Sequence, residues 1–102
     1  MTEDLSSRIF SEHLNSTFGL RVPNSQSVSL QLVEVTENDA PPGAEQFSVL
    51  FRGPRQDTIL QGIHTLRHEQ LGELELFLVP IGPDAIGMRY EAVFNRMRVR
   101  KP

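Results

Sequence analysis

Hydrophobic and polar residues alternate along most of the chain. The clearest alternation lies in residues 72–83, where leucines occupy every second position from Leu74 to Leu78. A two-residue period puts alternate side chains on opposite faces of a β-strand, so these leucines are predicted to face a core. Residues 63–67 and 88–95 flank this segment, and glycine, proline and aspartate mark the connections between them. The pattern therefore predicts three consecutive antiparallel strands.

Three further strands are predicted earlier in the chain, over residues 17–22, 27–36 and 46–52. In the second of them the apolar positions change parity at Val33 and Val35, which indicates a bulge or a strand that passes from one packed surface to another. Residues 37–45 hold two prolines, a glycine and three acidic residues, a composition typical of a loop.

An amphipathic helix is predicted at residues 5–15 because Leu5, Ile9, Phe10 and Leu14 fall on one side at a 3.6-residue period. Together these elements predict one mainly β domain spanning residues 1–102. We expect a small antiparallel meander barrel, or a strongly bent sheet, of about six strands capped by the N-terminal helix. A two-layer sandwich is the alternative.

Some apolar residues occupy strand positions that the alternation assigns to the outer face, away from the predicted core. These residues, with two arginines of the basic segment 96–102, make up a candidate interface of Leu50, Phe77, Val79, Val93, Arg96 and Arg98. A strand that is apolar on both faces is expected where both faces are covered. The predicted helix is the cover that the chain itself offers, and a partner or a second copy of the chain is the alternative.

Composition narrows the classes of function. The 102 residues carry a net charge of −3 and include no cysteine, which excludes disulfides and thiol chemistry. No apolar run approaches the length of a membrane span, and the N-terminal residues do not resemble a secretory signal. We therefore expect a cytoplasmic protein that binds neither membranes nor nucleic acid.

Candidate chemistry is sparse. His64 and His68 could bind a metal ion with Glu69 as a third ligand. Four residues along a strand separate the two histidines by about 13 Å, so both could bind one ion only if His68 curled back within its turn. Glu73 and Glu75 resemble a carboxylate pair, but a charged outer face that contacts arginines on neighbouring strands is the simpler interpretation. We predict no catalytic residue, no metal site and no cofactor, and therefore no enzyme.

One loop offers a candidate binding site. Gly53, Pro54 and Arg55 follow a predicted strand, where they could present a binding loop or form a rigid turn. The basic residues 96–101 include no aromatic residue for stacking on bases, which argues against binding to nucleic acid.

Several strings of residues resemble a family of small, uncharacterised bacterial β-rich proteins. These strings are Phe51-Arg52-Gly53-Pro54, Gln61-Gly62 with Leu66-Arg67-His68, the segment from Leu71 to Pro83, and Tyr90 to Asn95. The resemblance covers nearly the whole chain and implies no assigned activity. Similar proteins encoded near phage-tail-like fibre proteins imply an accessory or assembly role.

The sequence thus favours a non-catalytic protein-interaction or structural module, such as an accessory or assembly subunit of a phage-tail-like fibre or another larger complex. A protein partner is expected, and a homo-oligomer is compatible with the pattern. The alternative is a small-ligand-binding β-barrel. Large side chains at the predicted inward positions would fill such a barrel, which disfavours that alternative.

Overall fold

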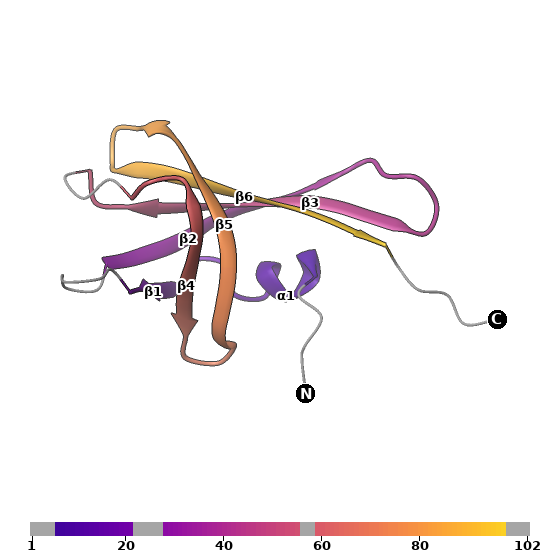
Figure 1. The fold of residues 1–102 in the computed structure, drawn as a ribbon, viewed down its shortest axis with the longest axis horizontal. Coiled ribbons are helices and arrows are strands. Elements are labelled where there is room, and N and C mark those ends of the chain that lie inside the picture. Colours follow the sequence, from indigo (N-terminus) through magenta and orange to yellow (C-terminus); the bar gives the residue numbers. More distant parts are fainter. Residues whose placement is uncertain (1–5, 22–27, 56–58, 98–102) are drawn as a thin grey trace.

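The computed structural model describes residues 6–21, 28–55 and 59–97 (Figure 1). These residues form one short helix and six strands, as the mainly β prediction requires. The elements are α1 (Ser7–Ser11), β1 (Thr17–Leu20), β2 (Val28–Asn38), β3 (Ala44–Gly53), β4 (Gly62–His68), β5 (Gly72–Pro83) and β6 (Met88–Met97).

All six strands are antiparallel and belong to one sheet that closes on itself in the order β1-β2-β3-β6-β5-β4. The predicted meander of the last three strands is confirmed, because β4 pairs with β5 and β5 with β6. The meander order stops once, between β3 and β4. There β3 pairs with β6, and β4 returns to pair with β1, which closes the ring. The hydrogen bonding is continuous around this ring, so the alternative of two stacked sheets does not apply.

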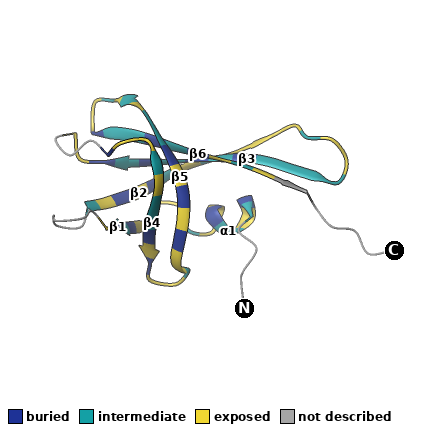
Figure 2. Ribbon diagram, viewed as in Figure 1, coloured by how far each residue is buried: buried dark blue, intermediate teal, exposed yellow. Residues whose placement is uncertain are grey.

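The core fills the inside of the closed sheet. Its largest fully buried side chains are Tyr90, Phe10, Phe18, Phe47 and Phe51. On β5 the predicted inward leucines are buried and the residues between them are exposed, which Figure 2 shows as alternating dark blue and yellow. The two-residue pattern therefore assigned the inner face of this strand correctly.

The predicted bulge in the second strand is present. The register between β2 and β3 shifts between Leu32 and Glu34, so Val33 is the extra residue. A bulge bends its strand. Before this bulge β2 pairs with β1 as well as with β3, and after it β2 pairs with β3 alone among the described strands.

The end of the last strand differs from the prediction. The sequence predicted that this strand ends at Asn95 and that a basic segment, residues 96–102, follows it. Instead β6 stays in regular register with β3 as far as the pair of Met97 with Ala44. The change of apolar parity in the sequence at Met97 therefore does not end the strand.

The helix is shorter than predicted and covers a different surface. Helix α1 begins after Ser6, whose side chain accepts a hydrogen bond from the Ile9 amide, and it ends at Ser11. Residues 12–15 form a turn, and Asn15 takes a left-handed conformation with φ 69°. The helix lies against β2 and β3. Figure 1 shows it where β5 diverges from β3 and β6.

Phe10 anchors this short helix in the core. Its ring centroid lies 6.1 Å from that of Phe47 and 5.4 Å from that of Phe94. The expectation that the helix covers Phe77 is therefore wrong, because Phe10, the buried apolar side chain of the described helix, packs on the inner face of the sheet. Leu14, expected in the covering stripe, is exposed.

Candidate functional site

The main candidate site is an apolar surface on the outer face of the sheet. Its members come from β3, β4, β5 and β6, and we call them the outer strip: Leu50, Ile63, Phe77, Val79 and Val93. Ile63 pairs with Phe77 across β4 and β5. Val79 and Leu50 both pair with Glu91 of β6, from opposite sides. Strand pairing thus gathers into one surface residues that are far apart in the sequence.

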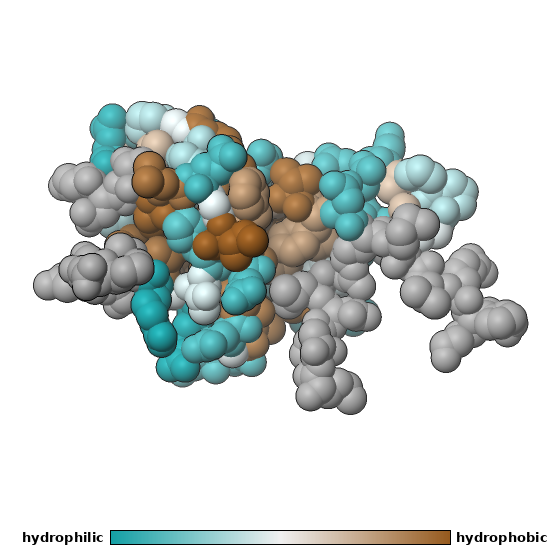
Figure 3. All heavy atoms as spheres, in the orientation of Figure 1, coloured by the Kyte–Doolittle hydropathy of each residue, from teal (hydrophilic) through white to brown (hydrophobic). Residues whose placement is uncertain are grey.

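Three members of the outer strip are strongly exposed for apolar side chains. Ile63 is 71%, Phe77 50% and Val93 58% exposed, whereas Leu50 and Val79 are half-buried. Figure 3 shows hydrophobic atoms, in brown, over β4 and β5 and continuing toward β3 and β6, with polar atoms between them. Single exposed apolar residues are ordinary on a protein surface, but a group on one face marks a candidate interaction site.

Carboxylates interrupt the outer strip. Glu75 is exposed one outward position from Phe77 on β5, and Glu91 is half-buried between Val79 and Leu50. Neither carboxylate forms an ion pair with a described residue. The guanidinium of Arg67 is already paired with Glu73 at 3.2 Å. Within the described residues, the surface therefore combines apolar side chains with two carboxylates that have no ion-pair partner.

A second ion pair fixes the turn that follows β5. Arg52 donates from Nε and from a terminal nitrogen to Oδ2 of Asp84, at 3.0 and 2.7 Å. Oδ1 of Asp84 accepts hydrogen bonds from the amides of Ile86 and Gly87. The bonds from Arg52 and from these amides hold the pKa of Asp84 well below its usual range. Arg52 is therefore committed to the turn and does not neutralise the outer strip.

The structure brings together four of the six predicted interface residues. Leu50, Phe77, Val79 and Val93 lie on the same outer face, which agrees with their predicted parity. The backbone of Arg96 pairs with Glu45 of β3, while its side chain and Arg98 lie outside the described residues. The prediction missed Ile63. The expected pairing of its strand with the next one could have placed Ile63 beside Phe77.

The predicted binding loop divides into two parts. Gly53 is the last residue of β3, is buried, and pairs with Met88. A Cβ atom at this position would lie 2.6 Å from Cδ2 of Leu30, so a larger residue here would require the buried Leu30 side chain to shift. Pro54 and Arg55 are exposed beyond the strand end. Gly53 thus serves the fold, and only Pro54 and Arg55 present surface.

The two histidines of β4 serve separate contacts. Nε2 of His64 donates to the carbonyl oxygen of Leu60 at 2.7 Å. His68 is buried, and its Nδ1 accepts hydrogen bonds from the amides of Gln70 and Leu71 at 3.0 and 3.2 Å. Among the described residues, no three histidine or acidic side chains are placed to hold a metal ion.

The His68 ring also contacts Ser16, which raises the possibility of a serine nucleophile with a histidine base. Its Nε2 lies 3.0 Å from Oγ of Ser16. Because Nδ1 accepts from two amides, the proton of the neutral ring sits on Nε2, which donates to Ser16. Ser16 in turn donates to the carbonyl oxygen of His13. The base of a nucleophilic serine must accept from the hydroxyl, so this arrangement holds two turns together and does not activate the serine.

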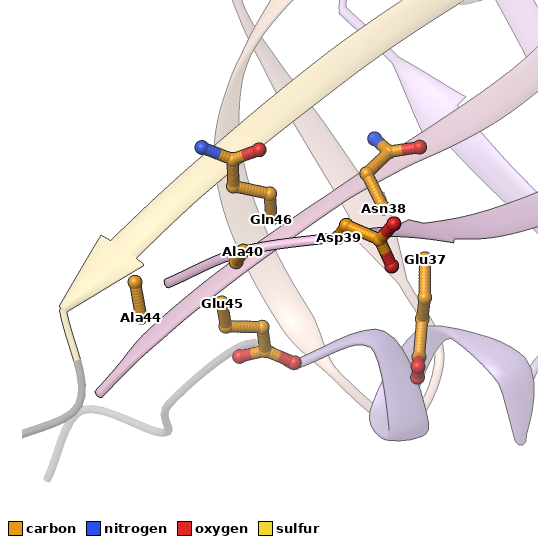
Figure 4. Close-up of a pocket in the computed structure, with 7 residues that line it drawn as sticks. All are labelled: Glu37, Asn38, Asp39, Ala40, Ala44, Glu45 and Gln46. Carbon is orange, nitrogen blue, oxygen red and sulfur yellow. The ribbon is translucent and has the colours of Figure 1, made fainter. Parts of the chain in front are cut away.

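The hairpin between β2 and β3 contains a pocket of about 210 Å³. In Figure 4, Glu37 and Glu45 point toward α1, whereas Asn38 and Gln46 point to the other side of the ribbon. Both carboxylates contact buried Ser7 at the start of the helix, Glu37 by accepting from the serine hydroxyl at 2.5 Å. Carboxylates at this end of a helix complement its exposed amides. The acidic pocket thus attaches α1 to the sheet.

The described helix is far too short and too polar to cross a membrane. Comparison with curated proteins finds no match, and comparison with solved structures finds none either. A family model, described as a domain of unknown function (DUF6916), matches residues 5–94. The matched region includes α1, all of β1 to β5 and most of β6, and therefore every member of the outer strip. The chain belongs to the DUF6916 family.

Proposed function

We propose that this domain is a non-catalytic protein-interaction module, an accessory or assembly subunit of a larger complex such as a phage-tail-like fibre. It docks onto a partner protein through the outer strip. The observation that supports this proposal is the group of exposed apolar side chains on one face, centred on Phe77 and Ile63. The buried centre of an interface is more apolar than the rest of the surface and is enriched in aromatic residues such as phenylalanine. A cytoplasmic location belongs to the same proposal.

The charge of the outer strip indicates the chemistry of the partner. Glu75 and Glu91 lie among the apolar residues, and neither forms an ion pair with a described residue. In a symmetric dimer, the same face of two copies would meet, which would bring four carboxylates into one interface. Like charges that meet across an interface cost several kcal/mol. The outer strip therefore suits a different protein whose contact surface is apolar and carries lysine or arginine.

The interior of the sheet favours this function over a small-ligand barrel. Phe18, Phe47, Phe51 and Tyr90 are fully buried inside the closed sheet, and rings from different strands contact one another. A six-stranded closed sheet has a narrow interior that side chains of this size fill. The proton position on His68, which cannot serve Ser16 as a base, supports a non-catalytic role.

Polar substitutions in the outer strip are expected to abolish partner binding without unfolding the domain. The test compares wild-type chain with the double variant Phe77→Ser, Val93→Ser as baits in lysate of the cells that naturally produce the protein. Burial of a large apolar side chain contributes about 1.5–3 kcal/mol, so losing two should weaken binding on the order of 100-fold or more. Mass spectrometry then quantifies each captured protein.

The matched control carries Leu60→Ser and Ile86→Ser, which change two apolar residues that lie outside the outer strip and are even more exposed than Phe77 and Val93. At least one partner should bind the wild type and this control equally and be lost from the strip variant. Thermal unfolding should show that both variants remain folded. If every captured protein depends equally on both pairs of residues, or on neither pair, the outer strip is not the docking surface.

A further inference from the structure

The closed sheet has one weak seam, between β1 and β4. Among the described residues this seam has two registered pairs, Gly19 with Arg67 and Leu20 with Leu66, and a long backbone bond of 3.5 Å from Arg21 to Thr65. Every other pair of adjacent strands has at least four registered pairs. The ring is therefore expected to open first at this seam, because the fewest backbone contacts must be broken there.

His68 spans this seam with its side chain. It is the last residue of β4, and its ring contacts three residues on the other side of the seam. The ring centroids of Phe18 and His13 lie 4.5 and 4.7 Å from that of His68, and Oγ of Ser16 accepts from its Nε2. We propose that His68 is an acid-sensitive latch that keeps the β1–β4 seam closed, and that protonation of its ring releases the seam.

The hydrogen bonds of His68 require a neutral ring. Protonation would put a hydrogen on Nδ1, which faces the amide donors of Gln70 and Leu71. Nδ1 would then no longer accept the two hydrogen bonds from these amides, and its own N–H would point at their N–H groups. The positive charge would lie in a site where His68 is only 5% exposed, beside the imidazole of His13. Burying a charge without a close partner is costly, so the protonated ring favours an open seam.

The charged groups around His68 set the direction of its titration. Burial lowers the pKa of His68, His13 from the turn after α1 lowers it further, and Glu69 in the turn after β4 raises it. Phe18 and Ser16 face it from β1 and the preceding turn without charge. The net pKa lies below the ordinary value of 6.5. The stabilisation by neutral His68 is therefore complete above about pH 6.5, and it is lost as the pH falls toward the lower folded pKa.

Hydrogen–deuterium exchange of the whole chain at pH 7.5 and pH 5.0 tests this inference, with rates corrected for intrinsic exchange. The paired amides at the β1–β4 seam should lose protection on the order of tenfold or more at the lower pH, since each pH unit changes protonation tenfold. The paired amides of β3 and β6 should keep theirs. A uniform change across all strands, or no change at the seam, would overturn the proposal.

Two variants and one direct measurement complete the test. His64→Gln removes the half-buried histidine of the same strand, which has no registered pair with β1 among the described residues, and should behave as the wild type. His68→Gln should weaken the seam at pH 7.5 and remove its pH dependence. If His68→Gln does not fold, nitrogen NMR of the His68 ring in the wild-type protein tests the proposal instead. The latch requires a proton on Nε2 at pH 7.5 and a pKa of His68 below 6.5. A proton on Nδ1, or an ordinary pKa, contradicts the latch. This inference does not depend on the proposed function.

Discussion

Replacing Phe10 by alanine is expected to destabilise the domain by about 3–5 kcal/mol, the range for removing a buried phenylalanine. The side chain is fully buried, and its ring contacts those of Phe47 and Phe94. Helix α1 has five residues, too few to be stable without tertiary contacts. The substitution therefore removes core packing and the main anchor of the helix together. Denaturant unfolding of both proteins measures the difference in free energy.

Leu14→Ala is the matched control, because Leu14 follows the same helix and is 42% exposed. We expect this change to cost less than about 1 kcal/mol, as surface substitutions usually do. Equal losses for the two variants would mean that α1 does not attach to the sheet through Phe10.

Leu76→Ala is expected to cost about 2–5 kcal/mol, as other large-to-small changes in a core do. Leu76 lies in the middle of β5, is buried, and has buried Leu74 and Leu78 on either side along the inner face. Such a loss is a large share of the roughly 5–15 kcal/mol that keeps a typical domain folded. Thermal and denaturant unfolding at neutral pH provide the measurement.

The adjacent residue gives the sharpest comparison. Phe77→Ala removes a larger side chain, but from the exposed face, and should cost less than about 1 kcal/mol. A greater loss at position 77 than at position 76 would reverse the assignment of the two faces of β5. It would also remove the main support for the outer strip as a docking surface.

Much of the fold could be predicted because alternation is a local property. The leucines of β5 and the parity change at Val33 each reflect which face a side chain takes, and that depends only on position along one strand. Glycine and proline marked the connections for similar local reasons. These features required no knowledge of which strands are neighbours.

The remaining features depend on contacts that alternation does not encode. The pairing of β3 with β6 is set by closure of the sheet, as is the return of β4 to β1. The place of α1 is set by where Phe10 fits between Phe47 and Phe94. A helical stripe predicts that a helix packs, but it does not predict which face of a sheet receives it.

The candidate site was partly predictable for the same reasons. The prediction that Phe77 and Val93 face outward was correct. Their exposure could not be predicted, because it depends on where the helix packs. Leu66 and His68 lie two residues apart on β4, so an inward Leu66 implies an inward His68. The burial of His68 could therefore have been predicted from the sequence, although only its distance from His64 was considered there. Its contacts with Ser16 and His13 come from a distant part of the chain and required the structure.

Site-specific photocrosslinking tests the proposed function most directly. Phe77 is replaced by p-benzoylphenylalanine in cells that naturally produce the protein, and Leu60, which is 80% exposed outside the outer strip, is replaced in parallel. We predict a light-dependent adduct between position 77 and a different protein, and no such adduct at position 60. No adduct at position 77, an adduct with a second copy of the chain, or the same adduct from both positions would show that the outer strip does not dock onto a different protein.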